Sequence, residues 1–395
     1  MEVEVEAEGG LFCFNPKDDT QQVLKILEAL KQASHDLQKN PDSKKTDGKI
    51  SFSHSPAIKA LLELENESES ILSNDPHLTT LSTHLSALKT LIHNSYNARQ
   101  RDHGLRSFLI RRANSYEISR VAGSIESEIQ AWIDREFIET LTQTLRRAGE
   151  TKEEVLIDLM EQFEERIARG FDRELQDAIL RSKVFVELET ILCDFKFSKK
   201  VRETSAFAIA ELIKFNKDVF VGQVLMGKTV RALISLSSVR SIQVLCILIR
   251  SIKSPIVDEI ESNGEIPKII TFLSSDDFSI RTMAMDCVLE IGYFGRKEAI
   301  DAMLEEDLVK KLVELQKSET RGVLMDVRGE SKNVERHPFS SCVARFAVQL
   351  EVGEGLRQRE KRALKQVVLK RVKEAHVCDA EAATIIAEVL WGASP

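Results

Sequence analysis

One pattern of apolar positions occurs three times within residues 184–315. Each copy begins with a β-branched residue followed by arginine, and apolar residues continue from there at helical spacing. The clearest copies start at Val201-Arg202 and Ile280-Arg281, and a weaker one starts at Val239-Arg240. A period of roughly forty residues with two or three helical segments per unit is typical of stacked helical repeats. The pattern therefore predicts an α-helical solenoid over residues 184–395.

A different arrangement of helices is predicted ahead of the repeats. Apolar stripes follow Thr20, Ala57 and Pro76, and a long amphipathic stretch covers residues 105–148, with a kink expected near Asn114 or Gly123. Helices with one apolar face each must pack on one another. We therefore expect an acidic disordered tail at 1–20, a helical bundle at 21–150 and connecting helices at 151–183.

The periodicity is interrupted once inside the repeats. Residues 318–338 are polar and include Gly322, Gly329 and Pro338, which predicts an inserted loop within the fourth unit. The helical pattern then resumes, and a last helix is expected from Ala380 to Trp391. Its apolar residues, Trp391 among them, are expected to close the core at the end of the array.

Composition limits the fold class and the kinds of partner. Trp, Tyr, Pro and Gly are scarce among 395 residues, which favours an all-α fold. The net charge of −8 provides no overall field for a polyanion, so nucleic acid is an unlikely partner. The six cysteines follow no C-x-x-C spacing, which indicates neither a zinc site nor a disulfide framework. No signal peptide or membrane span is expected, and we place the protein in the cytoplasm, the nucleus or both.

A nucleotide-binding motif is matched by residues 222–229. Gly222, Gly227, Lys228 and Thr229 fit the letters G-x-x-x-x-G-K-[ST], and 219–221 could be a short strand before them. The bulky residues between the glycines suit a helix better than a phosphate-binding loop, and no alternating strands and helices surround them. We favour the interpretation as part of the second repeat, with no cofactor, metal or catalytic residue, and keep a P-loop as the alternative.

A basic stretch follows at 357–373. Its cations are interleaved with apolar residues at helical spacing, so that one face can pack while the other is charged. The candidate partner-binding cations are Arg357, Arg359, Lys361, Arg362, Lys370 and Arg371. The alternatives are an import-receptor contact, a phosphoinositide or membrane contact, and a solvated face of the last repeat.

Residues 263–284 resemble an armadillo repeat. Asn263-Gly264-x-Ile266-Pro267 leads into an apolar helix, an acidic turn follows, and Ile280-Arg281-x-x-Ala284 opens the next helix. The order of a bundle and then repeats is similar to the plant U-box/armadillo proteins, but the Cys-Pro-Ile…Asp-Pro-Val pattern of a U-box is missing. The resemblance therefore implies the interaction modules of that family without its ligase activity.

The resemblance also identifies candidate positions for a partner. Import adaptors of the armadillo type carry a ladder of asparagines on the third helix of each repeat, and Glu211, Ser251 and Glu290 occupy the corresponding places here. The amide ladder is absent, so import function is not implied. We expect a non-catalytic scaffold or adaptor that binds one or more proteins on the solenoid surface.

Overall fold

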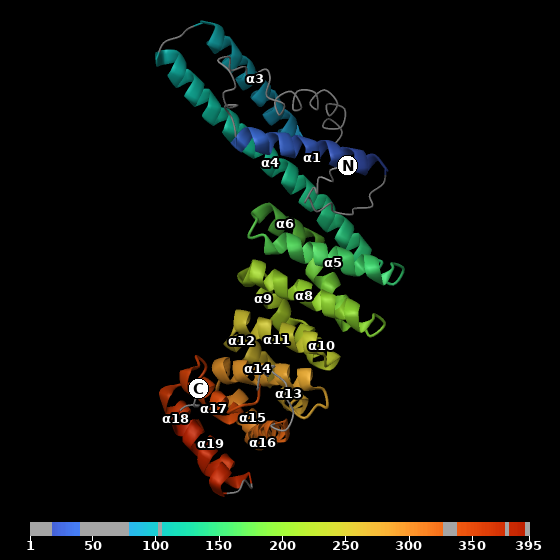
Figure 1. Ribbon diagram of the computed structural model, residues 1–395. Coiled ribbons are helices and arrows are strands. Elements are labelled where there is room, and N and C mark those ends of the chain that lie inside the picture. The colour runs from blue at the N-terminus through green and yellow to red at the C-terminus, as the bar shows by residue number, and fades with distance from the viewer. Residues whose placement is uncertain (1–17, 40–78, 102–104, 327–337, 376–378, 392–395) are drawn as a thin grey trace. The chain divides into compact units, whose positions relative to one another are not determined.

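The computed structural model describes residues 18–39, 79–101, 105–326, 338–375 and 379–391 (Figure 1). Every regular element within these ranges is a helix. The chain divides into two compact units, one formed by residues 1–143 with 172–182 and the other by 144–171 with 183–395. The predicted all-α fold class is confirmed.

In the described part of the first unit, three long helices surround one apolar core. These are α1 (Asp18–Lys39), α3 (Thr79–Arg101) and most of α4 (Leu105–Arg146), and the unit also includes α6 (Arg173–Ser182). Leu27, Leu81, Leu85, Ile125 and Trp132 are among the buried residues that form this core. The stripe predicted after Ala57 lies outside the described residues. The kink predicted in 105–148 was wrong, because α4 continues without a break through both predicted positions.

Polar contacts join α1 and α3 to α4 beside this core. His35 Nδ1 lies 3.3 Å from Glu126 Oε2, and His84 Nδ1 lies 3.0 Å from Glu128 Oε1. Both pairs are partly exposed, so each adds little to stability but fixes which faces of the helices meet.

The second unit is a stack of three-helix layers. Two shorter helices precede a longer one in the layers that end with α11 and α14, whereas α16 and α18 are longer than the helices α17 and α19 that follow them. The helices α5, α8, α11, α14, α17 and α19 pack in that order, each on the one before. Figure 1 shows α5, α8, α11 and α14 one below another. The helices of this unit are α5 (Glu153–Ala168), α7 (Val184–Cys193), α8 (Lys199–Phe215), α9 (Lys217–Met226), α10 (Thr229–Leu236), α11 (Val239–Ile252), α12 (Ser254–Ser262), α13 (Ile266–Phe272), α14 (Phe278–Phe294), α15 (Lys297–Glu305), α16 (Leu308–Asp326), α17 (Cys342–Val352), α18 (Gln358–Glu374) and α19 (Asp379–Trp391).

Side-chain caps explain why α8, α11 and α14 begin where they do. Ser198 accepts a hydrogen bond from Val201 N at the start of α8, and Ser238 and Ser241 form a capping box at α11. Asp277 accepts from Ser279 N at the start of α14. These three caps lie about one repeat apart in the sequence. The helix starts therefore recur with the same period as the apolar pattern.

The layers also meet through close backbone contacts at their junctions. Glu354 N and Gly355 N donate to the carbonyl oxygen of Tyr293 at 2.8 and 3.2 Å. In the layer before, Ser254 Oγ donates to the carbonyl oxygen of Phe294 at 2.7 Å. The links that follow α11, α14 and α17 are therefore joined by hydrogen bonds from one layer to the next.

Three boundaries differ from the sequence-based expectation. The predicted connector 151–183 is divided between the units: α5 packs on α8 within the array, and α6 belongs with the first unit. The insertion predicted at 318–338 starts inside α16, which continues to Asp326, because a single glycine costs a helix only about 1 kcal/mol. Residues 327–337 lie outside the described part. Trp391 does not close the core as predicted, since it is 88% exposed while Ile385 and Val389 are buried.

Candidate interaction surfaces

The solvent-facing residues of α8, α11, α14 and α17 form one continuous surface, which we call the third-helix face. On each helix they recur every three or four residues, opposite the buried residues of the array core. The residues are Glu203, Phe207 and Glu211 on α8; Arg240, Gln243, Ile247, Arg250 and Ser251 on α11; Asp286, Glu290 and Tyr293 on α14; and Arg345, Val348, Gln349 and Val352 on α17.

Opposite charges link neighbouring helices across this face. Arg250 Nε donates to Glu290 Oε1 at 2.7 Å, and this hydrogen bond raises the pKa of Arg250. Arg240 Nε lies 3.7 Å from Glu203 Oε2, and its guanidinium stacks on the ring of Phe207 at 4.8 Å. These pairs hold the charged side chains in defined positions beside the half-buried Phe207 and Ile247.

The three ladder residues predicted from the sequence all lie on the third-helix face. Glu211 Oε1 is 2.5 Å from Lys214 Nζ on the same helix, and Ser251 Oγ donates to the carbonyl oxygen of Ile247 at 2.8 Å. Glu290 is engaged by Arg250. The structure thus brings the three residues onto one face, with every one of them already in a local contact.

An acidic cluster at the start of this face was missed by sequence reasoning. Burial, and after it the nearby carboxylates of Glu211 and Glu161, raise the pKa of Glu164 on α5 from 4.5 to about 8, against smaller opposing effects of Arg240 and Lys214. Its Oε1 atom is buried without a hydrogen-bond partner among the described residues. The run Glu161 to Glu165 holds three glutamates, but nothing in that run alone places one of them against α8.

The P-loop lookalike has a different structure from the one a nucleotide requires. Gly222 lies inside α9, so residues 219–221 are helical rather than the strand considered above. Lys228 N, Thr229 N and Thr229 Oγ1, which a phosphate would engage in a P-loop, all donate to Glu189 Oε1 of α7 at 2.7, 2.9 and 2.7 Å. A carboxylate of the preceding layer therefore occupies the N-terminus of α10.

Alanine substitutions at the two glycines of that motif are expected to change the free energy of unfolding in opposite directions. Gly222→Ala should raise the free energy of unfolding by about 0.5–1 kcal/mol, because alanine is the better helix former and open space surrounds this site. A Cβ at Gly227 would lie 2.6 Å from the carbonyl oxygen of Gln223 and closer still to Glu189 Oε1, so Gly227→Ala should destabilise by about 1–3 kcal/mol. Urea unfolding of both variants measures the difference. A P-loop would instead need both glycines, and equal losses would contradict the helical interpretation.

The basic stretch forms α18, and several of its candidate residues are engaged within the array. Lys361 Nζ donates to the carbonyl oxygens of Glu351 and Gly353 at 2.9 and 2.8 Å, which caps the end of α17. Arg357 N donates to Glu360 Oε2 at 2.8 Å at the start of the helix. Arg359, Arg362 and Lys370 are exposed on its outer side.

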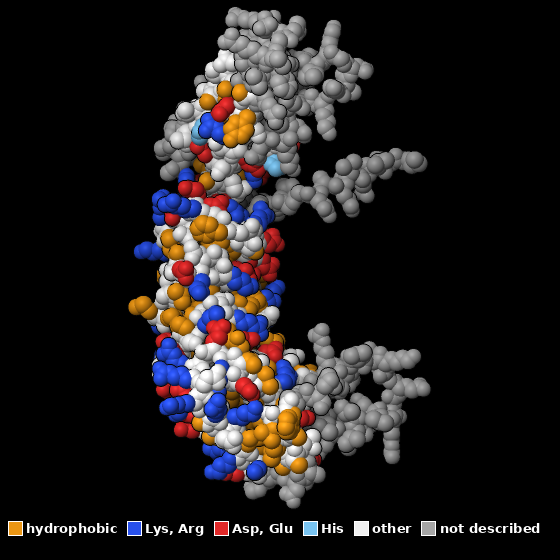
Figure 2. Space-filling model, turned by 90° about the vertical axis from the view of Figure 1, so that its left-hand side faces the viewer, with side chains coloured by type: hydrophobic (Ala, Val, Ile, Leu, Met, Phe, Trp, Pro, Cys, Tyr) orange, Lys and Arg blue, Asp and Glu red, His pale blue; other side chains and the backbone are white. Residues whose placement is uncertain are grey.

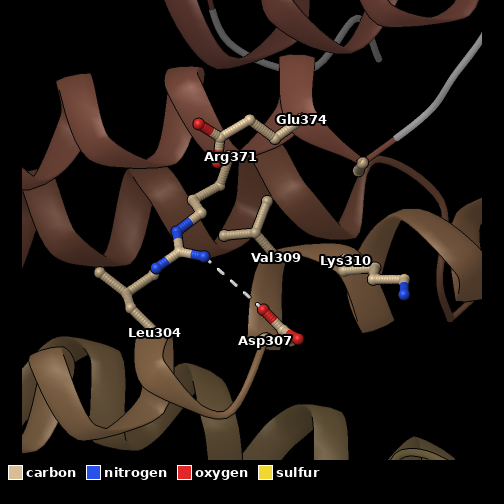
Figure 3. A pocket seen from close by; sticks show the side chains of 7 residues that line it. Leu304, Asp307, Val309, Lys310, Arg371 and Glu374 are labelled. Carbon is tan, nitrogen blue, oxygen red and sulfur yellow. Dashed lines mark ion pairs between the residues drawn. The ribbon is translucent and has the colours of Figure 1, made fainter.

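Arg371 borders a small cavity between α15, α16 and α18 (Figure 3). The cavity has a volume of about 170 Å³, and Leu304, Val309, Lys310 and Glu374 also line it. The Arg371 guanidinium points across it to Asp307, with 3.6 Å between Nη1 and Oδ1. This space is below the range of cofactor pockets, and its arginine is already paired.

The described residues contain neither a metal-binding cluster nor a single helix able to cross a membrane. No group of three or more His, Cys, Asp or Glu side chains there could hold a metal ion. No single helix there is long and apolar enough to cross a membrane. The bent pair α9 and α10, at 69° to each other, meets the criteria by length and composition alone, and six of the eight residues of α10 are buried in the array.

The architecture defines the class of protein: an all-α chain whose second unit is an armadillo-like solenoid of three-helix layers. No protein-family model matches the sequence, and no curated protein matches it. A designed armadillo repeat protein is similar over 65% of this chain and 99% of its own, with 14% identity and a TM-score of 0.43. Another, in complex with the peptide (KR)4, is similar over 65% and 98%, with 15% identity and a TM-score of 0.44. An engineered protein covers 94% of this chain and 98% of its own at 14% identity and a TM-score of 0.38.

Proposed function

We propose that the protein is a non-catalytic scaffold that binds an extended segment of a partner polypeptide along the third-helix face. The observation that carries the proposal is the continuity of this face over four stacked helices. A rigid row of helices that presents side chains at regular intervals suits a ligand that is itself a repeating chain.

The chemistry of the face supports a polypeptide rather than a small molecule. The half-buried Phe207 and Ile247 and the exposed Val352 stand beside charged pairs that are fixed by their neighbours. Apolar and aromatic residues supply contact area, and the pre-positioned charges supply specificity at little entropic cost. A cofactor would need an enclosed pocket, which this open face does not provide.

The two ends of the face favour different parts of a partner. Glu164, Glu161 and Glu211 cluster at the α5–α8 end, so a basic side chain bound there would relieve the repulsion between them. Val348 and Val352 are 38% and 57% exposed on α17 at the other end and favour an apolar side chain. We therefore expect a bound segment with a basic residue toward α5 and an apolar residue toward α17.

A displayed peptide library selected on the full chain tests the proposal. The variant Glu211→Lys with Ile247→Glu reverses one charge and removes one apolar contact on the third-helix face. We expect it to weaken the selected peptides at least about tenfold in fluorescence polarisation, because a buried apolar contact alone contributes more than 1 kcal/mol.

The matched control makes the same kinds of change away from this face. Glu298→Lys lies on α15 and Met226→Glu at the end of α9, and both side chains are exposed. The control should bind within about twofold of the unmodified chain. Equal losses in both variants, or a selection that yields no binding peptide, would contradict the proposal.

A further inference from the structure

The solvent-facing side of α18 carries a row of cations, most of them outside any ion pair among the described residues. Arg359, Arg362, Lys370 and Lys373 recur along one side of the helix, opposite the buried Leu364, and all four are exposed. Lys370 has only a 3.6 Å contact with Glu374 on the same helix. Arg359, Arg362 and Lys373 make no ion pair with any residue that the structure describes, which leaves a strip of positive charge at the end of the array.

The neighbouring helix α19 ends in exposed apolar side chains. Leu390 is 47% exposed and Trp391 is 88% exposed, in the last turn of a helix that packs against α18. Glu381 and Glu388 of α19 contact α16: Glu381 lies 3.6 Å from Lys317, and Glu388 accepts a hydrogen bond from Gln316. Large exposed apolar side chains of this kind mark interaction sites on protein surfaces.

The cations and the apolar residues belong to the same end of the array. Figure 1 shows α18 and α19 side by side at this end of the array, and the two helices pack against each other. In Figure 2 the lower part of the array shows a group of apolar side chains bordered by lysines and arginines. We call the surface of Arg359, Arg362, Lys370, Lys373, Leu390 and Trp391 the α18–α19 face.

We propose that the α18–α19 face binds the surface of an anionic lipid bilayer. Lysine and arginine attract acidic headgroups, and tryptophan is the side chain that most favours the boundary between headgroups and acyl chains. The combination of a basic helix with exposed tryptophan and leucine is typical of peripheral membrane contacts. A contact of this kind is reversible and lies at the membrane surface.

Two other occupants fit this face less well. A second copy of the chain would bring two basic strips together, and their repulsion opposes such a dimer. Nucleic acid would satisfy the cations but leave Leu390 and the edge of Trp391 in water. A bilayer accommodates both kinds of side chain.

Sedimentation of the full chain with vesicles tests the proposal. We expect binding to vesicles in which about one lipid in four is phosphatidylserine, little binding to phosphatidylcholine alone, and a strong decrease as salt is raised. Reversing Arg359, Arg362, Lys370 and Lys373 to glutamate should weaken binding more than about a hundredfold, since each cation near the surface contributes roughly a fivefold change in affinity.

A matched variant controls for net charge. Lys196, Lys199, Lys200 and Lys217 are also exposed lysines of the array, at the α8 end. Changing these four to glutamate alters the net charge by the same amount and should leave vesicle binding within about threefold. Circular dichroism checks that both variants keep their helices.

Trp391 provides an independent readout, because the chain has only two tryptophans and the other, Trp132, is 6% exposed in the bundle core. Anionic vesicles should shift its emission to the blue, and Trp391→Phe should abolish the shift while keeping binding within about threefold. The proposal is overturned if the charge-reversed chain still binds, if the emission is unchanged on sedimenting vesicles, or if the shift arises from concentration-dependent dimers without lipid. Displacement by a soluble inositol phosphate would also overturn it, in favour of a headgroup site.

Discussion

Replacing Gly355 with alanine is expected to lower the free energy of unfolding by about 3 kcal/mol or more. A Cβ at this position would lie 2.5 Å from the carbonyl oxygen of Phe294 and closer still to that of Gly295. Both obstacles are backbone atoms, so no side chain can rotate away. The link would have to move, which would also break the hydrogen bonds from Glu354 N and Gly355 N to Tyr293.

Urea unfolding of the full chain, followed by circular dichroism, measures this loss. The matched control is Gly149→Ala, where nothing lies within 4 Å of the added Cβ, and it should change stability by less than about 0.5 kcal/mol. If Gly355→Ala unfolded at the same urea concentration as the control, the result would contradict the close backbone approach at Gly355 between the layers.

Glu164→Gln should stabilise the protein at alkaline pH and have little effect in acid. The carboxyl of Glu164 has its pKa raised from 4.5 to about 8 by burial and by Glu211. The folded state therefore holds a proton that the unfolded state releases, so the stability of the unmodified chain falls as the pH rises from about 4.5 to about 8 and then levels off. Glutamine cannot ionise, so the variant avoids this loss.

The size of the effect follows from the same shift. Allowing for solvent screening at this partly exposed group, we expect a gain on the order of 1–3 kcal/mol at pH 8.5 and almost none at pH 4.5. Thermal unfolding at both pH values checks it, with Glu165→Gln on the exposed side of α5 as the control. A gain that is equal at the two pH values would show that packing, and not ionisation, is responsible.

The repeated layers could be predicted because they depend on local rules. The 3.6-residue spacing of apolar residues and the caps at Ser198, Ser238 and Asp277 are visible in the sequence itself. The placement of Glu211, Ser251 and Glu290 on one face follows from the same period. Contacts between layers are different, since they depend on which side chains of separate helices meet.

The arginine at the second position of each repeat copy illustrates why contacts between layers could not be predicted. Arg202 Nε donates to the carbonyl oxygen of Leu192, and Arg281 Nη1 donates to that of Ser275, so both close the turn before their helix. Arg240 occupies the same place in the sequence pattern but stacks on Phe207 and pairs with Glu203 of the layer before. Its different role depends on Phe207, which no local pattern connects to it.

The match to the P-loop motif did not predict the local structure, again because a contact between layers determines it. The letters Gly227-Lys228-Thr229 are compatible with a phosphate or with any other anion at the start of a helix. Glu189 lies in the preceding layer, and only the stacking of α7 against α10 brings its carboxylate to Lys228 N and Thr229 N. A motif of eight residues contains no information about that partner.

Hydrogen–deuterium exchange of the full chain with and without a selected peptide tests the central claim most directly. If a polypeptide lies along the third-helix face, added protection should be found in α8, α11, α14 and α17 together, with α9, α12 and α15 unchanged. Protection confined to α9, α12 and α15, or to the helices of the first unit, would show that the partner binds elsewhere and would contradict the account.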